Sequence, residues 1–503
     1  MTDFVTCTYG SRVLTIEKGT HISEILSPEH KTGHICGGKG TCKKCRVLAF
    51  GEISAPTETE TSCFSAEELA DGLRLACQTK VMGDCRIEAS ENGVAQICTE
   101  GTLPDFLWTP VFEQFGAAVD IGTTTLVVSL YDKTRLLATA SASNPQSIFG
   151  ADVMSRVQAS LEGKKAELAV LLRKAVSTLL TECAATAGVL VTDIDRVAIA
   201  GNTAMLYFLT ERDASCLSRA PFVADHLFGE WVSGASLSLP CAAANVYLAP
   251  CVSAFVGADA TLALLSSGLC EKEETALLCD IGTNGEMALW HKGDLFCCST
   301  AAGPAFEGAG LSCGMRGEMG AIDKVWAENG RMGIHVIGET APRGICGGGA
   351  VDAIAYLLQT EKLDETGCLE DDPYFFAKDV FLTGEDVRNI QLAKGAIFAG
   401  IKTLMRATDI CTDELAHLYI AGGFGLYLSL KNAQTIGLLP KIEKEKVCLL
   451  GNGALMGAAL ILLDSSAEKR VKAISQTAKT IELAGSPIFR EAYIDAMFFT
   501  GET

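Results

Sequence analysis

The apolar and polar positions of the chain form two patterns that meet near residue 100. Residues 1–98 contain short alternating apolar runs and many turns, which predicts a small β-rich module. From Gly116 onward, apolar strands alternate with helical stretches such as Lys164–Ala187 and Lys394–Ala407, a pattern typical of an α/β domain. Residues 99–115 include two prolines and have no clear period, so we expect a linker with anchoring aromatic side chains.

An internal repeat divides the α/β region. AAVDIGTTTLVVSLYD (Ala117–Asp132) matches LLCDIGTNGEMALWHK (Leu277–Lys292), and each predicts a strand, a turn and a second strand. VAIAGNTAMLYFL (Val197–Leu209) parallels LYIAGGFGLYLSL (Leu418–Leu430), and each predicts a strand, a glycine-containing turn and an apolar helix. We therefore expect a tandem duplication of one lobe. The predicted limits are 1–98 for the β-rich domain, 99–115 for the linker, 116–270 for lobe 1 and 271–503 for lobe 2.

Composition narrows the class of protein. The 503 residues are 48% hydrophobic, which supplies material for more than one core. The net charge of −20 is spread along the chain, so we expect no nucleic-acid partner, which would require clustered Lys and Arg. The most apolar late stretch, Val447–Leu463, is interrupted by Asn452 and three glycines, and we predict no membrane span. The N-terminus lacks the features of a signal peptide, which favours the cytoplasm.

The spacing of four cysteines predicts an iron–sulfur cluster. CGGKGTCKKC and LRLACQT give a C-x5-C-x2-C arrangement with a distant fourth cysteine, and the spacing resembles that of adrenodoxin-like ferredoxins. The glycines of the loop let the backbone wrap closely around the sulfurs of a [2Fe–2S] cluster. A structural zinc site fits less well because it prefers two closely paired cysteine knuckles. The candidate ligands are Cys36, Cys42, Cys45 and Cys77.

The two DIGT hairpins predict a nucleotide site. Backbone amides and threonine hydroxyls in such turns can surround phosphate oxygens, and an aspartate can hold Mg²⁺ directly or through water. Two hairpins in one chain suggest two arms that grip one triphosphate, while the later glycine turn admits an adenine against bare backbone. The candidate catalytic residues are Asp120 and Asp280, and the candidate nucleotide-binding residues are Gly122, Thr123, Thr124, Thr125, Gly282, Thr283, Asn284, Gly285, Gly422 and Gly423.

These motifs together resemble a known family. DIGTTT, DIGTNGE, AGGFG and GNGALMGA, in that order, resemble the phosphate-1, phosphate-2, adenosine and second connecting motifs of the acetate and sugar kinase, heat-shock chaperone and actin superfamily. Fused behind a [2Fe–2S] module, they resemble the reductive activators of corrinoid proteins. GNTAM (Gly201–Met205), AGPAFEGAGLSCGMRGEMGAI (Ala302–Ile322) and ICGGGAVDAI (Ile345–Ile354) are further family-like signatures. The resemblance implies an α/β fold with an N-terminal β-grasp (α+β), ferredoxin-like domain and duplicated actin-like ATPase lobes.

The resemblance also implies an activity. An ATP-hydrolysing metallo-oxidoreductase of this kind reduces an inactive cobalt(II) corrinoid to cobalt(I) and returns an anaerobic methyltransferase system to activity. It implies a [2Fe–2S] cluster, ATP and Mg²⁺ as cofactors, with a corrinoid protein and a cellular low-potential electron donor as partners. Longer family members carry an extra domain between the ferredoxin and ATPase regions, and its absence here leaves open whether a homodimer forms.

Other interpretations stay open on the sequence alone. An ATP-gated activator of another low-potential enzyme and a small-molecule kinase of the same superfamily are the main alternatives. A chaperone lacks room for a peptide-binding module, and a pure electron carrier leaves most of the chain without a role. Glu286 and Glu307 are candidates for positioning an attacking water, although surface or helix-capping roles are equally compatible with their positions. Gly257–Asp259 is a candidate for the interlobe connection or the partner surface, and ordinary packing is equally compatible with its position.

Overall fold

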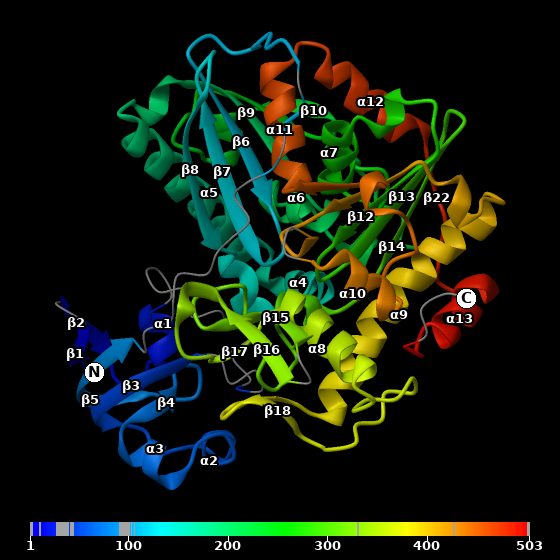
Figure 1. Cartoon of the computed structure of the whole chain (residues 1–503). Helices are drawn as coiled ribbons and strands as arrows, with labels where there is room; N and C mark the ends of the chain where they lie inside the picture. Colours follow the sequence, from blue (N-terminus) through cyan, green and yellow to red (C-terminus); the bar gives the residue numbers. More distant parts are fainter. Residues whose placement is uncertain are drawn as a thin grey trace.

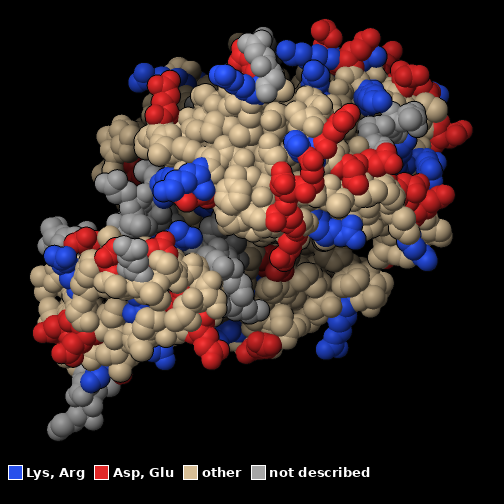
Figure 2. All heavy atoms as spheres, turned by 60° about the horizontal axis from the view of Figure 1, so that its bottom comes forward, with Lys and Arg blue, Asp and Glu red and all other residues tan. Residues whose placement is uncertain are grey.

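A computed structural model describes residues 4–9, 12–26, 40, 45–89, 101, 103–104, 106–328, 331–425 and 428–499. In Figure 1 the N-terminal module lies at lower left, the sheet of lobe 1 at upper left and the sheet of lobe 2 at right. Acidic and basic side chains are interspersed on the face shown in Figure 2. Among the described residues, no helix combines the length and apolar character needed to cross a bilayer.

The N-terminal module is a five-stranded mixed sheet with the strand order β2-β1-β5-β3-β4. Strand β1 runs antiparallel to β2 and parallel to β5, which confirms the expected β-grasp arrangement. The strands are β1 (Phe4–Tyr9), β2 (Arg12–Glu17), β3 (Arg46–Ile53), β4 (Leu73–Leu75) and β5 (Val81–Ala89), and the helices are α1 (Ile22–Leu26), α2 (Glu58–Thr61) and α3 (Ala66–Ala70).

Lobe 1 is built on a six-stranded sheet with the order β10-β11-β9-β6-β7-β8. Its central strands are nearly continuous buried apolar runs, as expected where helices cover a sheet. The strands are β6 (Phe115–Ile121), β7 (Thr125–Tyr131), β8 (Leu136–Ser143), β9 (Ile194–Gly201), β10 (Glu230–Ser233) and β11 (Asn245–Leu248). The α-helices are α4 (Val153–Ala159), α5 (Lys165–Ala187), α6 (Thr203–Leu209) and α7 (Ala258–Ser267).

Lobe 2 has the order β21-β20-β12-β13-β14-β22, and its first five strands repeat the arrangement β11-β9-β6-β7-β8 of lobe 1. In both lobes an antiparallel meander (β6-β7-β8 and β12-β13-β14) is extended by two parallel strands, which confirms the predicted duplication. The strands are β12 (Ala276–Ile281), β13 (Gly285–His291), β14 (Asp294–Thr300), β20 (His417–Ala421), β21 (Val447–Gly451) and β22 (Ala478–Thr480). The α-helices are α8 (Gly347–Gln359), α9 (Gly384–Ala407), α10 (Leu430–Thr435), α11 (Gly453–Leu463), α12 (Ala467–Thr477) and α13 (Pro487–Asp495). Smaller sheets are formed by β15 (Ala321–Glu328), β16 (Arg331–Val336) and β17 (Gly344–Ile345), and by β18 (Tyr374–Ala377) and β19 (Val380–Leu382).

Two helix predictions differ from the structure. The stretch predicted from Lys394 begins ten residues earlier, at Gly384, because Thr383 and Asp386 form a capping box at the start of α9. The apolar helix predicted within Leu418–Leu430 is not found in the described part of that stretch. Residues 422–424 form a bend and turn, Gly425 is a 3-10 residue, and residues 426–427 lie outside the described residues. The α-helix α10 begins only at Leu430, where Ser429 caps it. Gly422, with φ +89°, turns the chain away after β20.

One hydrophobic core spans both lobes, and lobe 2 has a second core of its own. Helices α7 of lobe 1 and α11 of lobe 2 pack against each other, and α11 also covers β6 and β9 of lobe 1. The segment that enters lobe 1 is bound to the end of α11, because the backbone N–H groups of Thr109 and Val111 donate to the carbonyls of Leu463 and Leu462 at 2.7 and 2.9 Å. Helices from both halves therefore form the layer between the two sheets.

Candidate functional site

A cavity of about 310 Å³ lies where the hairpin turns of the two lobes meet. Eleven of the predicted catalytic and nucleotide-binding residues line it, and the structure therefore brings together residues that are up to 303 positions apart. These are Asp120, Gly122, Thr123, Thr124, Thr125, Asp280, Gly282, Thr283, Asn284, Gly422 and Gly423. Gly285 is not among the lining residues. It begins β13 and pairs with Ile281 and Thr300, and a Cβ there would lie 3.1 Å from Cγ1 of Ile397.

Buried polar side chains form hydrogen bonds to the backbone of the turn of lobe 1. The Gly122 N–H donates to the Thr125 carbonyl at 2.9 Å and closes the turn. The fully buried Arg156 donates from Nη2 to the Thr123 carbonyl at 2.7 Å, and Asn144 donates to the Gly122 carbonyl at 2.9 Å. These contacts use carbonyls of the turn and fix its backbone on the cavity wall.

Glu307 joins the two turns. It ends a short 3-10 helix, Pro304–Glu307, which stops at Gly308 with φ +71°. Its Oε2 accepts from Thr124 Oγ1 at 2.8 Å, and its Oε1 accepts from Thr283 Oγ1 at 2.8 Å. One carboxylate thus bridges a hydroxyl of lobe 1 and a hydroxyl of lobe 2.

The cavity is rich in carboxylates. Among its described lining residues there are five, Asp120, Asp259, Asp280, Glu286 and Glu307, and Arg316 is the only Lys or Arg. Burial raises the pKa of Asp120 to about 6, although the amide of Asn452, 2.9 Å from Asp120 Oδ2, lowers it. Burial, followed by repulsion from neighbouring carboxylates, raises the pKa of Asp280 to about 7.

Two further carboxylates have raised pKa values. Burial and the charge of Asp120 raise the pKa of Asp259 to about 7, although backbone hydrogen bonds lower it. Burial and the charges of Asp259 and Asp280 raise the pKa of Glu286 well above its usual range. No three His, Cys, Asp or Glu side chains within the described ranges converge as a ready-made metal cage. Mg²⁺ usually keeps several waters and takes one or two carboxylates beside a phosphate, and the carboxylates of Asp120 and Asp280, which both line the cavity, are of that chemistry.

The opposite side of the cavity presents bare backbone and aromatic rings. Phe306 and Phe424 stack with their centroids 4.9 Å apart and both line the cavity. Beside them, Gly347 and Gly348 open α8, so the N-terminus of a 13-residue helix faces the cavity. A Cβ at Gly347 would lie 1.9 Å from the Phe306 carbonyl oxygen, so the close approach requires glycine. Helix N-terminal amides favour anionic groups, and flat apolar rings suit a base.

Sequence reasoning missed four polar residues of the site. Asn202 donates to Thr123 Oγ1 at 3.0 Å, and Asn452 reaches Asp120. Each asparagine follows a glycine at the end of a strand and caps the next helix. This repeated Gly-Asn pair in the sequence could have indicated both residues. Asp259, from the segment with open roles, and Arg316, 3.3 Å from Ser143 Oγ, also line the cavity.

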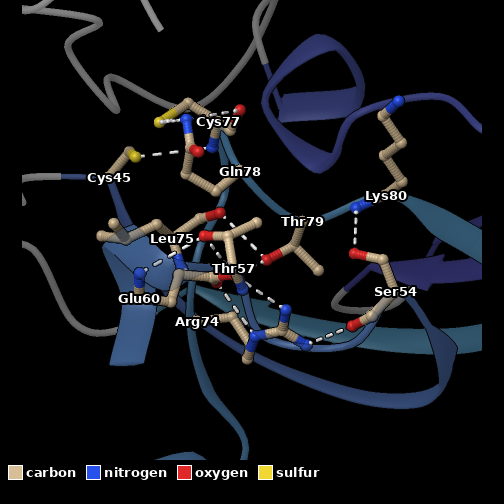
Figure 3. Close-up of polar contacts among 10 residues, drawn as sticks. All are labelled: Cys45, Ser54, Thr57, Glu60, Arg74, Leu75, Cys77, Gln78, Thr79 and Lys80. Carbon is tan, nitrogen blue, oxygen red and sulfur yellow. Dashed lines mark hydrogen bonds and ion pairs between the residues drawn. The ribbon is translucent and has the colours of Figure 1, made fainter. Parts of the chain in front are cut away.

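The N-terminal module brings two of the four predicted cluster ligands together. Cys45 lies just before β3 and Cys77 just after β4, and the Cys77 N–H donates to Cys45 Sγ at 3.4 Å (Figure 3). Both side chains are buried, with 2% and 6% of their surface exposed. Cys36 and Cys42 lie outside the described residues. A [2Fe–2S] cluster is held by four cysteine thiolates that converge on two irons. The proximity of Cys45 and Cys77 fits two of these four positions.

Comparison with known proteins gives consistent matches. The family model "RACo middle region" matches residues 115–272, and "C-terminal domain of RACo the ASKHA domain" matches residues 274–503. The chain is 32% identical over 557 aligned residues to "Corrinoid activation enzyme RamQ" of Eubacterium limosum, covering 92% of this chain and 93% of that protein. It is 28% identical over 298 residues to "[Co(II) methylated amine-specific corrinoid protein] reductase" of Methanosarcina barkeri, covering 54% of this chain and 53% of that protein. A solved structure, "Reductive activator for corrinoid,iron-sulfur protein", superposes with a TM-score of 0.71 at 28% identity and covers 98% of both chains.

Proposed function

The chain belongs to the family of reductive activators of corrinoid proteins, and from this premise we propose that it is an ATP-dependent enzyme that reduces an inactive cobalt(II) corrinoid to cobalt(I). The observation that carries the proposal is that one chain contains both a buried pair of candidate cluster cysteines, Cys45 and Cys77, and a carboxylate-rich cavity between two ATPase-fold lobes. An N-terminal redox module does not by itself imply an ATPase-fold region, nor the reverse, so their presence in one chain is informative. A relative that matches nearly the whole chain is named as a corrinoid activation enzyme.

In this proposal the interlobe cavity binds Mg-ATP. Asp120 and Asp280 hold Mg²⁺ directly or through water, and the turns at Thr123–Thr125 and Gly282–Asn284 donate to phosphate oxygens. Gly422 and Gly423 take the adenosine. Gly422 suits that task because a Cβ there would lie 2.8 Å from Asp280 Oδ1, so no larger residue fits.

The thiolates of Cys36, Cys42, Cys45 and Cys77 hold the cluster in this proposal. A [2Fe–2S] cluster bound there supplies a single electron. The chain's own task is to keep Cys45 and Cys77 buried beside the ends of β3 and β4, so that little reorganisation accompanies the change of charge.

Binding of ATP across both lobes provides the coupling. A one-electron transfer that is uphill by 59 mV costs about 1.4 kcal/mol, so conformational work must supply the difference. We infer that nucleotide binding and hydrolysis close and open the lobes and thereby control docking and release of the corrinoid protein. Such a movement would change the hydrogen bonds that Thr124 and Thr283 donate to Glu307 from opposite sides of the cavity.

The partners in this proposal are a corrinoid protein of a methyltransferase system and a cellular low-potential electron donor. A homodimer remains a prediction. We propose the cytoplasm as the location, because it supplies both ATP and the reductant.

Stimulation of ATP hydrolysis tests the proposal. ATPase activity is measured anaerobically with the cluster-loaded chain alone, with a cobalt(II) corrinoid protein, and with acetate and sugars. We expect the corrinoid protein to increase the rate and Asp120→Asn to abolish the increase. A rate that responds instead to a small molecule, with transfer of phosphate to it, would establish a kinase and overturn the proposal.

A further inference from the structure

The segment that carries Cys77 is clamped by a buried carboxylate. Glu60 is fully buried, and its Oε1 accepts from the Leu75 N–H at 3.0 Å and from Thr79 Oγ1 at 2.9 Å (Figure 3). These two residues stand two positions before and two positions after Cys77. One side chain therefore fixes both flanks of the fourth predicted ligand.

The charge of that carboxylate is balanced locally. Arg74 donates to Glu60 from Nε and Nη2, both at 3.0 Å, and from Nη1 to the Ser54 carbonyl at 2.8 Å. Burial raises the pKa of Glu60, but hydrogen bonds from Arg74, Thr57 and Leu75 lower it to about 2, so the pair is an ion pair at neutral pH. A buried pair with no net charge adds rigidity beneath Cys77 and only a small net field at its sulfur.

Gln78 lies directly against the Cys77 sulfur. Its side-chain amide donates from Nε2 to Cys77 Sγ at 3.6 Å and to the Cys77 carbonyl at 3.4 Å, and Figure 3 shows the amide turned towards the thiol. The same side chain reaches the predicted ligand loop, because a Cβ at Gly40 would lie 3.1 Å from Gln78 Cγ and Cδ and 2.8 Å from Thr59 Cγ2. Gly40 has φ +75°, which favours glycine. Gln78 thus lies beside both Gly40 and Cys77.

We propose that Gln78 is a positioning residue that sets the reduction potential of the cluster through its N–H···S hydrogen bond to Cys77. This inference rests on the proposed function, since it requires the cluster. Reduction adds negative charge that the ligand sulfurs share, so an amide donor stabilises the reduced form more than the oxidised form and raises the potential. The amide is neutral at every physiological pH, so the effect does not depend on protonation.

Potentiometric titration of the cluster in the full chain tests this role. Gln78→Met keeps the length of the side chain and removes the donor. We expect the equilibrium constant for one-electron reduction to fall about tenfold, a downward shift of about 59 mV. Gln78→Glu, which replaces the donor with a carboxylate, should lower the potential further.

The matched control is Thr59→Ser. It removes the methyl group nearest Gly40 and leaves the amide donor in place, so we expect the wild-type potential. Electron paramagnetic resonance of the reduced protein verifies that each variant holds a [2Fe–2S] cluster, and thermal unfolding verifies the fold. Wild-type potentials in both Gln78 variants, or an equal shift in Thr59→Ser, would overturn the inference while leaving the proposed function intact. Absence of a [2Fe–2S] signal from reconstituted wild-type protein would overturn both.

Discussion

At the scale of single residues, Glu307 is the side chain through which the two lobes meet across the cavity. Its carboxylate accepts from Thr124 and Thr283 at the same distance, 2.8 Å, although these residues lie in different lobes. A triphosphate held by the two turns would approach the same hydroxyls. We therefore expect Glu307 both to respond to a bound nucleotide and to orient a water beside its terminal phosphate.

We expect Glu307→Gln to slow ATP hydrolysis about 10²-fold, because a positioned acid–base group contributes at least that much to the rate. Binding of a non-hydrolysable ATP analogue should be retained, since the variant removes one negative charge from a cavity that accepts phosphates. Steady-state hydrolysis and equilibrium titration check the two expectations. Glu307→Gln turning over at the wild-type rate would assign Glu307 to the interlobe contact alone.

The buried carboxylates predict an unusual dependence of stability on pH. The pKa of Asp280 is raised to about 7 in the folded protein, against an ordinary value of 3.8, so the folded chain binds more protons than the unfolded chain between these pH values. Stability contributed by this group therefore decreases as the pH rises from about 4 to 7.

Without Mg²⁺ and nucleotide, Asp280→Asn should stabilise the protein above pH 7 by about 1–3 kcal/mol and have the smallest effect near pH 4. Thermal unfolding at pH 5 and pH 8, with and without Mg-ADP, checks this. A variant less stable than the wild type at pH 8 in the absence of Mg²⁺ would show that Asp280 has a structural partner instead.

Asp120 and Asp280 could be predicted from the sequence because the hairpin that places each one is local and repeated. The position of Asp259 could not, since it reaches the cavity only when α7 packs between the sheets. Arg316 belongs to a glycine-rich stretch in which no periodic pattern marks one residue above its neighbours. The sequence also left the role of Glu307 open, because its two partners come from turns 159 residues apart.

At the scale of elements, the contact between α7 and α11 joins the lobes. A Cβ at Gly457 of α11 would lie 2.1 Å from the Leu262 carbonyl oxygen of α7, so the helices approach with backbone against backbone. Asp259 opens α7, and Asn452, which donates to Asp120, caps α11. Any change in the spacing of these helices would therefore shift Asp259 and Asn452 in the cavity wall.

Gly457→Ala should force the two helices apart and cost about 1–3 kcal/mol of stability, with weaker nucleotide binding. Gly453→Ala is the comparison within the same helix, because its Cβ would meet the Cβ of Ala263 at 3.2 Å, a milder contact. Thermal unfolding of both variants and nucleotide titration of Gly457→Ala measure the effect. Equal stability losses in the two variants would mean that helix spacing is not the cause.

Element-scale prediction succeeded where periodicity and repetition were strong. The helix predicted over Lys164–Ala187 is found as α5, Lys165–Ala187, and the repeated hairpins are found in both lobes. The region after β20 was mispredicted because an apolar stretch was interpreted as a helix, whereas Gly422 with its positive φ redirects the chain. That turn brings Gly423 and Phe424 to the cavity wall, so the mispredicted segment is part of the candidate site.

At the scale of the whole molecule, the chain joins a ferredoxin-like module to two ATPase-fold lobes, and the proposed activity uses both. The N-terminal module brings two candidate cluster ligands into contact beside its sheet, and the duplicated lobes enclose the cavity proposed to bind Mg-ATP. The backbone N–H groups of Thr109 and Val111 in the segment before lobe 1 are hydrogen-bonded to the end of α11, the helix that packs between the lobes. This arrangement provides a physical path by which nucleotide binding can alter presentation of the cluster.

Cobalt(I) formation tests the central claim most directly. The chain is loaded with its cluster, reduced anaerobically and mixed with a cobalt(II) corrinoid methyltransferase subunit, and cobalt(I) is followed by its absorbance with and without Mg-ATP. We expect cobalt(I) to form only with Mg-ATP, and its formation to be lost in Asp120→Asn and Asp280→Asn while the cluster spectrum is unchanged. Formation of cobalt(I) by either variant at the wild-type rate, or by the wild type without ATP, would contradict the central claim.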